Sequence, residues 1–430
     1  MNNKDIAVII LAAGKGVRMR SSLPKALCEL SGKPMVEFLL DSVSSSRIKN
    51  VIVVGGYKIQ LLRKRLASRD LKIVEQKSLL GSADAVKQAK TLLKNFGGSV
   101  LVLYADTPLI KESTLKQLIR SHQKSKATAT ILTVKTGDPK EYGRIARDEK
   151  GNICNIIEHT DIGGQGTGFR VQGRYEINVG AYCFDSKKLF DGLARIKKNK
   201  IKGEYYLTDI IPYLYNKGYK VNSYAITDIE EAMGLNRRED MVHAEDVLNR
   251  RTVNKLLDSG VMIKDPKNTY IQADAKIGKD TTIYPFVVIG RNVKIGRGCK
   301  IGPFVHLRPG AILKDGAEVG NFVEIVRSSL GPDSKAKHLT YLGDAHIGRN
   351  VNIGAGTITA NYDGKSKNIT IIDDNSFIGS GTTIVAPVKI GKRASTGAGC
   401  VVVKGRNVLP GTTVVGVPAK PINHKVKKKR

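Results

Sequence analysis

The chain is 430 residues long, which allows two or three domains that each have a hydrophobic core. Its hydrophobic content of 41% is ordinary, and it has neither an apolar run of about 18 residues nor a signal peptide, so we expect a cytoplasmic protein without membrane insertion. The net charge of +32 indicates anionic partners, but the basic residues are spread along the chain without a nucleic-acid-binding motif, which favours phosphorylated small molecules over nucleic acid.

The first half of the chain alternates predicted strands with predicted helices. A continuous apolar run, Ile6 to Leu11, is typical of a central parallel strand. Further strands are predicted at residues 51–54, 71–74, 100–104 and 128–134, and the clearest helix between them at residues 113–124. This alternation predicts an α/β doubly wound domain.

Two features of this half are suited to a nucleotide. The first strand runs into Ala12-Ala13-Gly14, where backbone amides could hold a phosphate or a base edge, although many such turns need glycine only for their geometry. The strand at residues 100–104 ends at Ala105-Asp106, at the sheet edge where open α/β folds bind ligands. Asp106 could hold Mg²⁺ there, or it could cap the following turn that contains Pro108.

Residues 238–260 predict a connecting helix, because their apolar side chains recur at an irregular helical spacing and Gly260 suits a C-cap. From residue 271 onward the pattern changes, and an aliphatic side chain falls at every sixth position. These side chains are Ile271, Ile277, Ile283, Ile289, Ile295, Ile301, Leu307, Leu313, Val319 and Ile325. A period of six is typical of a parallel β-helix, in which each short strand stacks its aliphatic side chain on those of neighbouring coils.

The hexapeptide pattern is interrupted near residues 328–337 and again at residues 361–365. Excursions from a solenoid often build a binding site, so the second interruption is a candidate binding loop. His338 lies in the region of the first interruption, beside Tyr341 and downstream of Glu324. It is a candidate general base, although a lone histidine is more often structural.

A series of motifs, in chain order, resembles the sugar-nucleotide pyrophosphorylases. The motifs are LAAGKGVRM with Pro24-Lys25, Gln76 with Gly81-Ser82, Tyr104-Ala105-Asp106, Tyr142-Gly143-Arg144, Ile157-Glu158-His159, Ile177-Asn178 and residues 203–209. Together with the hexapeptide pattern, they are similar to the bifunctional bacterial N-acetylglucosamine-1-phosphate uridyltransferase and glucosamine-1-phosphate N-acetyltransferase. The resemblance implies a pyrophosphorylase (uridyltransferase) domain at residues 1–237, a linker helix at 238–262, and a left-handed β-helix acetyltransferase domain with a basic C-terminal tail at 263–430.

The resemblance implies two reactions in a homotrimer. Acetyl-CoA would acetylate glucosamine-1-phosphate, and the N-acetylglucosamine-1-phosphate would then take a uridylyl group from UTP and release pyrophosphate. Arg18 and Lys25 match the cations that neutralise the phosphates, and Asp106 and Asn236 match the Mg²⁺ ligands. The other matching substrate positions of the uridyltransferase are Leu11, Ala12, Ala13, Gly14, Gln76, Gly81, Ser82, Tyr104 and Ala105 for the nucleotide, and Gly143, Glu158 and Asn178 for the sugar.

For the acetyltransferase, the resemblance implies that His338 is the general base that takes a proton from the amine of glucosamine-1-phosphate, with Glu324 as a candidate orienting carboxylate. Arg308, Tyr341 and Asn352 match positions that hold the sugar phosphate. The positions that match acetyl-CoA contacts are Ala355, Asn361, Tyr362, Ser380 and Ala398. Acetyl-CoA lies between subunits in this family, so the resemblance implies a site that needs the oligomer.

Some residues depart from the family pattern. The family usually has Thr at the positions of Val17 and Ser82, His at Asp84 and Gly at Ala105. Asp84 is the least expected of these, because an anion near a polyphosphate site would repel it unless the side chain points away.

In the second half, Val326 stands where the family has a phosphate-binding Lys, and Gly416 where many relatives carry an Arg that reaches the CoA phosphates. The tail at residues 425–430 is a candidate source of the missing charge. Two alternatives therefore stay open: a uridyltransferase, or related sugar-1-phosphate nucleotidyltransferase, whose β-helix only trimerises it, and an assembly module that binds nucleotide sugars without turnover.

Overall fold

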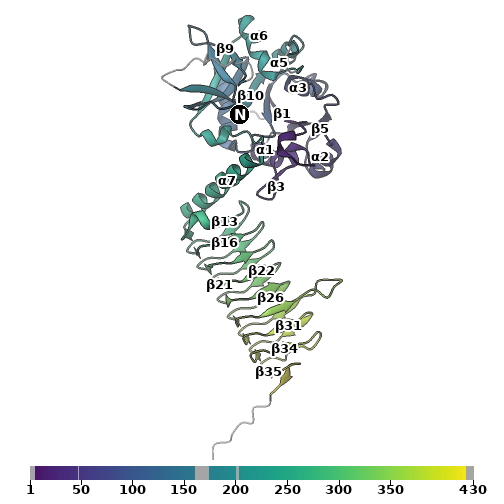
Figure 1. Ribbon diagram of the computed structural model, residues 1–430, viewed down its shortest axis with the longest axis vertical. Coiled ribbons are helices and arrows are strands. Elements are labelled where there is room, and N and C mark those ends of the chain that lie inside the picture. Colours follow the sequence, from purple (N-terminus) through teal and green to yellow (C-terminus); the bar gives the residue numbers. More distant parts are fainter. Residues whose placement is uncertain (1–4, 47, 160–173, 200–202, 423–430) are drawn as a thin grey trace, which may run out of the picture. The chain divides into compact units, whose positions relative to one another are not determined.

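The computed structural model describes residues 5–46, 48–159, 174–199 and 203–422 (Figure 1). The chain divides into two compact units, Met1–Glu245 and Asp246–Arg430, and α7 (Arg238–Asp258) runs across the division. The predicted role of the tail at residues 425–430 falls outside the described residues. In the described part, no helix has both the length and the apolar character needed to cross a membrane.

A central sheet with the strand order β11-β7-β10-β6-β1-β4-β5 organises the first unit. These strands are β1 (Ile6–Ala12), β4 (Asn50–Gly55), β5 (Lys72–Glu75), β6 (Ser99–Tyr104), β7 (Ala129–Thr136), β10 (Tyr175–Asp185) and β11 (Val221–Ile226). β10 is antiparallel to both β6 and β7, whereas the other neighbours on this path are parallel. The short strands β8 (Arg144–Arg147) and β9 (Ile153–Ile157) extend the sheet from β10, and β2 (Glu29–Leu30) pairs with β3 (Lys33–Pro34).

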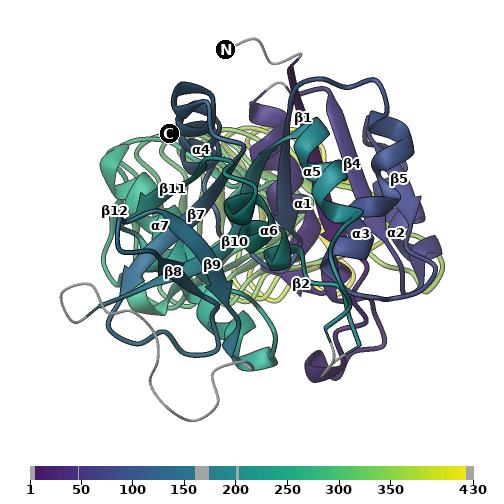
Figure 2. The same cartoon turned by 90° about the horizontal axis from the view of Figure 1, so that it is seen from above.

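Helices cover both faces of this sheet, as seen from above in Figure 2. One core contains residues of α1 (Met35–Ser45), α2 (Ile59–Leu66) and α4 (Glu112–Ser125), and the other contains residues of α3 (Ser82–Gln88), α5 (Ser186–Leu193) and α6 (Ile210–Asn216). Successive residues of β1 alternate between the two cores: Ile6, Val8 and Ile10 lie in the first, and Ala7, Ile9 and Leu11 in the second. Burial on both faces explains the continuous apolar run, and the doubly wound prediction is confirmed.

Three sheets wind through the second unit as a left-handed β-helix, which confirms the predicted solenoid. Their strands pair in parallel, except for the last pair of the first sheet, which is antiparallel. The first sheet contains β12 (Met262–Ile263), β15 (Thr282–Ile283), β18 (Lys300–Ile301), β21 (Glu318–Asn321), β24 (Lys335–His338), β27 (Asn352–Ile353), β30 (Phe377–Ile378), β33 (Ser395–Thr396), β35 (Thr413–Val415) and β36 (Lys420–Pro421). The second contains β13 (Thr269–Ile271), β16 (Val287–Ile289), β19 (His306–Leu307), β22 (Glu324–Val326), β25 (Tyr341–Gly343), β28 (Ile358–Ala360), β31 (Thr383–Val385) and β34 (Val401–Val402). The third contains β14 (Lys276–Ile277), β17 (Lys294–Ile295), β20 (Ile312–Leu313), β23 (Ser329–Leu330), β26 (Ala345–Ile347), β29 (Thr370–Ile372) and β32 (Val388–Ile390).

The predicted aliphatic positions stack in register and form the solenoid core. Ile271 pairs with Ile289, Ile289 with Leu307, and Leu307 with Ile325, so each coil in this part takes eighteen residues. All four side chains are buried. Each short strand therefore buries one aliphatic side chain, which stacks on the equivalent side chains of the coils before and after it. Because one such strand recurs every six residues, the aliphatic positions repeat with a period of six.

The two interruptions have different structures. In the first, the spacing between successive buried aliphatic residues falls from six positions to five between Ile325 and Leu330, and again between Leu342 and Ile347. In the second, the chain makes an excursion between β28 and β29, and a bridge between Tyr362 and Lys367 closes it. The first interruption is thus a pair of shortened turns, and the second is an inserted loop.

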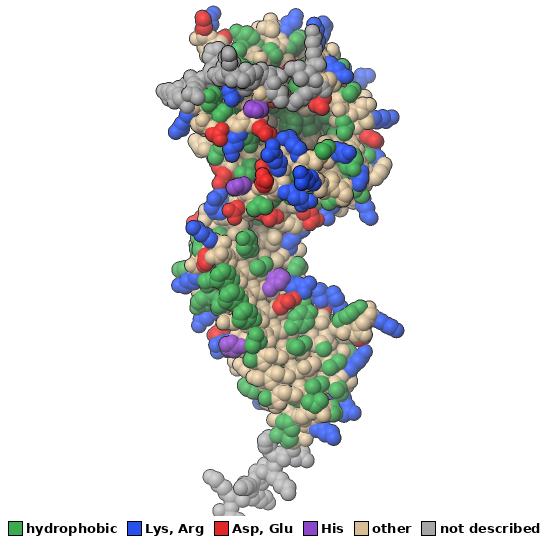
Figure 3. All heavy atoms as spheres, in the orientation of Figure 1, with side chains coloured by type: hydrophobic (Ala, Val, Ile, Leu, Met, Phe, Trp, Pro, Cys, Tyr) green, Lys and Arg blue, Asp and Glu red, His purple; other side chains and the backbone are tan. Residues whose placement is uncertain are grey.

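Three phenylalanines stack on one corner of successive coils. The ring centroids are 4.9 Å apart for Phe286 and Phe304 and 5.1 Å apart for Phe304 and Phe322, and all three side chains are exposed. Figure 3 shows apolar side chains gathered over the first coils of the solenoid. An exposed aromatic stack of this kind is unusual on a protein surface that stays in water.

Candidate active sites

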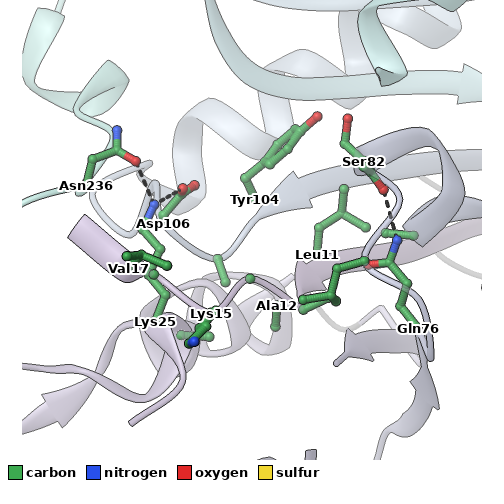
Figure 4. Close-up of a pocket in the computed structure, with 18 of the residues that line it drawn as sticks. Leu11, Ala12, Lys15, Val17, Lys25, Gln76, Ser82, Tyr104, Asp106 and Asn236 are labelled. Atoms are coloured by element: carbon green, nitrogen blue, oxygen red, sulfur yellow. Dashed lines mark hydrogen bonds and ion pairs between the residues drawn. The ribbon is translucent and has the colours of Figure 1, made fainter. Parts of the chain in front are cut away.

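Two adjoining pockets in the first unit bring together the uridyltransferase residues that the sequence predicted. One pocket lies at the carboxyl ends of β1 and β6 and is lined by Leu11, Ala12, Ala13, Gly14, Arg18, Lys25, Gln76, Gly81, Ser82, Tyr104, Ala105, Asp106 and Asn236 (Figure 4). The other shares Arg18, Ser82, Tyr104, Asp106 and Asn236 with it and adds Gly143, Glu158 and Asn178. The carboxyl edge of the sheet therefore carries a continuous set of polar groups, as expected for a ligand site of an open α/β fold.

Lys25 is at the centre of the charged end of these pockets. Its Nζ donates a hydrogen bond to Asn236 Oδ1 at 2.8 Å and forms an ion pair with Asp106 Oδ2 (Figure 4). Arg18 approaches from the exposed side, where its Nη2 donates to Asn236 Oδ1 at 3.2 Å and its Nη1 to Glu141 Oε2 at 3.3 Å. The Asp106 carboxylate thus faces the pocket and binds a cation.

The oxygens of Asp106 and Asn236 fit a magnesium ion. Both converge on the ammonium group of Lys25, so a single cation can lie between them. Mg²⁺ prefers oxygen ligands, and it uses only one or two protein groups when phosphates supply the remaining ligands. Within the described ranges, no three His, Cys, Asp or Glu side chains form a metal-binding cluster, so a metal here would take further ligands from substrate or water.

Gln76 lies at the other end of the first pocket, where its side chain is buried. Gly81 is close to it in a left-handed conformation with φ of 101°, and a Cβ at this position would lie 2.5 Å from the carbonyl oxygen of Tyr205. Only glycine fits so close an approach of two backbones. The hydroxyl of Ser82 accepts a hydrogen bond from the backbone N–H of Leu207 at 2.9 Å.

Asp84 points toward Gln76 and not into the pocket that Lys25 and Arg18 line. Its Oδ2 accepts a hydrogen bond from Gln76 Nε2 at 2.8 Å, and Asp84 is absent from the lining of both pockets. The repulsion that the sequence raised as a difficulty is therefore avoided by the direction of this side chain.

Gly143, Glu158 and Asn178 gather at the end of the second pocket. The backbone N–H of Asn178 donates to the carbonyl of Gly143 at 2.8 Å, and Thr208 Oγ1 donates to Glu158 Oε1 at 2.8 Å. The side-chain amide of Asn178 donates to the hydroxyl of Tyr182 at 2.6 Å. Burial raises the pKa of Tyr182 well above its usual value, so its hydroxyl stays protonated.

In the second unit, the predicted acetyltransferase residues lie on neighbouring coils. Glu324 on β22 is in register with Tyr341 on β25, and Arg308 Nη1 donates to Glu324 Oε1 at 2.7 Å. His338 is exposed at the end of β24, and no hydrogen bond joins it to Glu324 among the described residues. In this structure Glu324 pairs with Arg308, and the His338 ring is open to solvent.

Val326 and its neighbours occupy the two shortened turns. The Val326 side chain is only 3% exposed. Arg327, the next cation along the chain, donates from Nε and Nη2 to the two carboxylate oxygens of Asp344 at 2.6 and 2.7 Å. These hydrogen bonds hold the pKa of Asp344 below its usual value. Arg327 is therefore bound to a carboxylate and does not replace the missing lysine in this arrangement.

The predicted acetyl-CoA residues line one corner of the later coils and the inserted loop. Ala355, Ser380 and Ala398 occupy equivalent corners of three successive coils, where Gly381 N–H donates to the Ala355 carbonyl at 2.7 Å and Gly399 N–H to the Ser380 carbonyl at 2.8 Å. In the loop, Asn361 is buried and donates to Asp344, whereas Tyr362 is exposed. Asn352 is exposed on β27, in the same sheet as His338.

Comparison with known proteins agrees with this division. A nucleotidyl transferase family model matches residues 7–230, and a bacterial transferase hexapeptide model of six repeats matches residues 268–299 and 292–327. The chain is 40% identical over 424 residues to the bifunctional protein GlmU of Shouchella clausii (strain KSM-K16), which covers 91% of this chain and 92% of the relative. It is 39% identical over 429 residues to the GlmU of Listeria monocytogenes serotype 4b (strain CLIP80459), with 92% and 93% covered.

The chain belongs to the bifunctional GlmU family. It is therefore a bifunctional transferase, with its nucleotidyltransferase part in the first unit and its hexapeptide-repeat transferase part in the second. The GlmU match spans nearly the whole chain, so it includes both pockets and the coils that carry His338.

Sequence reasoning missed several residues of this GlmU site. Tyr182 lies four positions after Asn178 on β10, a strand that was not predicted, and it lines the second pocket. Lys15 and Glu204 also line the pockets, and both fall inside motifs that the sequence had singled out. Glu204 and Lys15 could have been predicted, because they fall inside these motifs. Tyr182 could be identified only after the structure placed β10 beside β6.

Proposed function

We propose that this chain makes UDP-N-acetylglucosamine in two steps, acetyl transfer from acetyl-CoA to glucosamine-1-phosphate followed by uridylyl transfer from UTP. The observation that carries the proposal is the charged centre in the first unit, where Lys25 and Arg18 converge on Asp106 and Asn236. Gln76 lines the first pocket, which would receive the base, and Gly143, Glu158 and Asn178 line the second pocket, which would receive the sugar.

In the uridylyl transfer, a phosphate oxygen of N-acetylglucosamine-1-phosphate attacks the α-phosphorus of UTP, and pyrophosphate leaves. The sugar phosphate is already an anionic nucleophile, so the protein needs no general base for this step. Lys25 and Arg18 would neutralise the phosphate oxygens as charge shifts to the leaving group. Asp106 and Asn236 would hold Mg²⁺, which supplies further charge neutralisation at the phosphates when it is bound.

In the acetyl transfer, the amine nitrogen of glucosamine-1-phosphate attacks the thioester carbon, a C–N bond forms, the C–S bond breaks, and CoA leaves. His338 would take the proton that the amine loses, since a neutral imidazole ring nitrogen can accept one. Arg308, Tyr341 and Asn352 would hold the sugar phosphate. The acetyl-CoA contacts would come from the corner column and the loop, at Ala355, Asn361, Tyr362, Ser380 and Ala398.

We further propose that the chain acts as a homotrimer in the cytoplasm, where UTP and acetyl-CoA are available. The exposed stack of Phe286, Phe304 and Phe322 supports association, because an apolar surface of this kind gains free energy when a second copy covers it. Light scattering coupled to size-exclusion chromatography measures the mass directly. A monomer at micromolar concentration would contradict the trimer.

Two assays on one preparation test the function. Pyrophosphate release from UTP and N-acetylglucosamine-1-phosphate with Mg²⁺ reports the first unit, and free-thiol release from acetyl-CoA and glucosamine-1-phosphate reports the second. Both products are expected. If pyrophosphate is released but no thiol is, the protein is a nucleotidyltransferase whose solenoid serves only as a scaffold. If a folded protein binds nucleotide but releases neither product, it is an assembly module without turnover.

A further inference from the structure

Glu141 is an exposed carboxylate that two arginines share beside the second pocket. Its Oε2 accepts a hydrogen bond from Arg18 Nη1 at 3.3 Å, and its Oε1 accepts one from Arg237 Nη2 at 3.4 Å. Glu141 and Arg18 both line this pocket. A carboxylate is unfavourable beside bound phosphates, because like charges repel. In this structure Glu141 instead binds a cation that the phosphates would need.

Backbone contacts hold Glu141 and Arg237 close to each other. The hydroxyl of Tyr142, the residue after Glu141, accepts a hydrogen bond from the backbone N–H of Gly234 at 3.2 Å. The backbone N–H of Arg237 donates to Asp240 Oδ2 at 2.7 Å. The Glu141 carboxylate therefore keeps one cationic partner, Arg237, when Arg18 moves to another anion.

The exposure of the Arg18–Glu141 ion pair makes it easy to open. The side chains are 56% and 60% exposed, whereas those of the Lys25–Asp106 pair are 13% and 29% exposed. An exposed ion pair contributes little to stability, because water and salt screen it. A phosphate carries more negative charge than a carboxylate and accepts two parallel hydrogen bonds from a guanidinium group. Arg18 can therefore exchange Glu141 for phosphate at small cost.

We propose that Glu141 is a positioning residue that holds Arg18 in the free protein and takes it back as pyrophosphate leaves. When phosphates bind, Arg18 moves from the Glu141 carboxylate to the phosphate oxygens. When pyrophosphate dissociates, the ion pair forms again, so Glu141 weakens pyrophosphate binding and favours its release. This inference rests on the proposed uridylyl transfer, in which Arg18 neutralises the phosphates.

The test is the dissociation constant of pyrophosphate, measured by isothermal titration with Mg²⁺ at about 50 mM salt. Glu141→Gln keeps the shape of the side chain and removes its charge, so pyrophosphate is expected to bind about fivefold more tightly. The KM for UTP should fall by a similar factor. At about 0.5 M salt the difference should shrink below about twofold, because charges are then screened within a few ångströms. A loss of structure would weaken binding instead.

Two further variants show whether the effect passes through Arg18. In an Arg18→Gln background, Glu141→Gln is expected to change the affinity for pyrophosphate less than about twofold. Glu112→Gln is the matched control, because Glu112 forms an exposed ion pair with Lys116 outside both pockets, and it should bind pyrophosphate as wild type does.

Unchanged or weaker binding by Glu141→Gln, in a protein that melts at the wild-type temperature, overturns the proposal. An equal gain with and without Arg18 also overturns it, since Glu141 would then act by repulsion alone. A wild-type protein that binds pyrophosphate but transfers no uridylyl group would instead contradict the uridylyl transfer, and the binding measurements would still decide the role of Glu141.

Discussion

Lys25→Met should increase the affinity of the free protein for Mg²⁺. In the structure, the Lys25 ammonium occupies the space between the two oxygens that would hold the metal, with Asn236 Oδ1 at 2.8 Å and Asp106 Oδ2 in an ion pair. Mg²⁺ must displace this group before it can bind without nucleotide. When nucleotide is present, its phosphates offer Lys25 a new partner, so the metal and the nucleotide should bind together.

The size of the effect follows from the hydrogen bonds that are lost. A hydrogen bond to a charged group contributes about 1.5–3 kcal/mol, and because Asp106 is 29% exposed we take the lower part of this range, about 2 kcal/mol. That free energy corresponds to roughly a 30-fold change in a dissociation constant. Allowing for water that replaces the ammonium, we expect Mg²⁺ to bind Lys25→Met about tenfold more tightly than wild type.

Isothermal titration of Mg²⁺ into the nucleotide-free protein measures this difference without reference to turnover. Lys33→Met is the matched control, because Lys33 pairs with Asp41 in a similar ion pair that lies outside both pockets. The Lys33 variant should bind Mg²⁺ as wild type does. Equal affinities for all three proteins would refute the reasoning, since they would mean that Lys25 does not compete with the metal. Uridylyl transfer by Lys25→Met should fall about 10²–10³-fold.

Three further predictions follow from single residues. His338→Gln should reduce thiol release from acetyl-CoA about 10²–10⁴-fold and leave pyrophosphate release unchanged, and equal thiol release would remove His338 from the mechanism. Val326→Lys should lower the KM for glucosamine-1-phosphate about tenfold: the Val326 side chain is 3% exposed, but a lysine is long enough to carry its ammonium group from this position to the surface, where it can contact the phosphate. An unchanged or higher KM would mean that the ammonium group does not reach the phosphate or that another cation already serves. Burial lowers the pKa of His122 from 6.5 to about 4, so this group contributes stability that is present above pH 6.5 and is lost as the pH falls toward 4. Between pH 7.5 and pH 5 the free energy of unfolding is expected to fall by about 2 kcal/mol from this group. His122→Gln can keep a hydrogen bond to Thr130 but does not titrate, so thermal melts should show a smaller fall in stability for this variant. The same fall in wild type and variant would contradict the role of His122.

The elements that the sequence predicted well are those whose signal is local. The run from Ile6 to Leu11 is apolar at every position because β1 is buried on both faces, and the six-residue period follows from one inward side chain per rung. β10 was missed because its burial alternates along part of its length and its antiparallel direction depends on β6 and β7, which are distant in the sequence. Tyr182 was missed with it.

The role of Asp84 shows a different limit. The sequence analysis marked it as an unexpected anion near the predicted phosphate site. Whether this carboxylate repels a phosphate depends on the direction of its side chain. Hydrogen bonds from Gln76 and Gln88 determine that direction. A pattern of residue types contains no such direction, because rotamers are chosen by packing after the chain has folded.

Residue order and periodicity are enough to predict the division into an α/β half and a hexapeptide half, the carboxyl-edge position of Asp106, and the residue types available for phosphate chemistry. These depend on periodicity and on order along the chain, which need no knowledge of distant contacts. The position of Lys25 between Asp106 and Asn236, which are 81 and 211 positions away from it, is a product of the folded chain and could not be read from the order of residues. That arrangement exists because the parallel strands and the segment before α7 bring their ends to one edge of the sheet, and the electrostatic attraction between an ammonium group and two oxygens then selects the geometry.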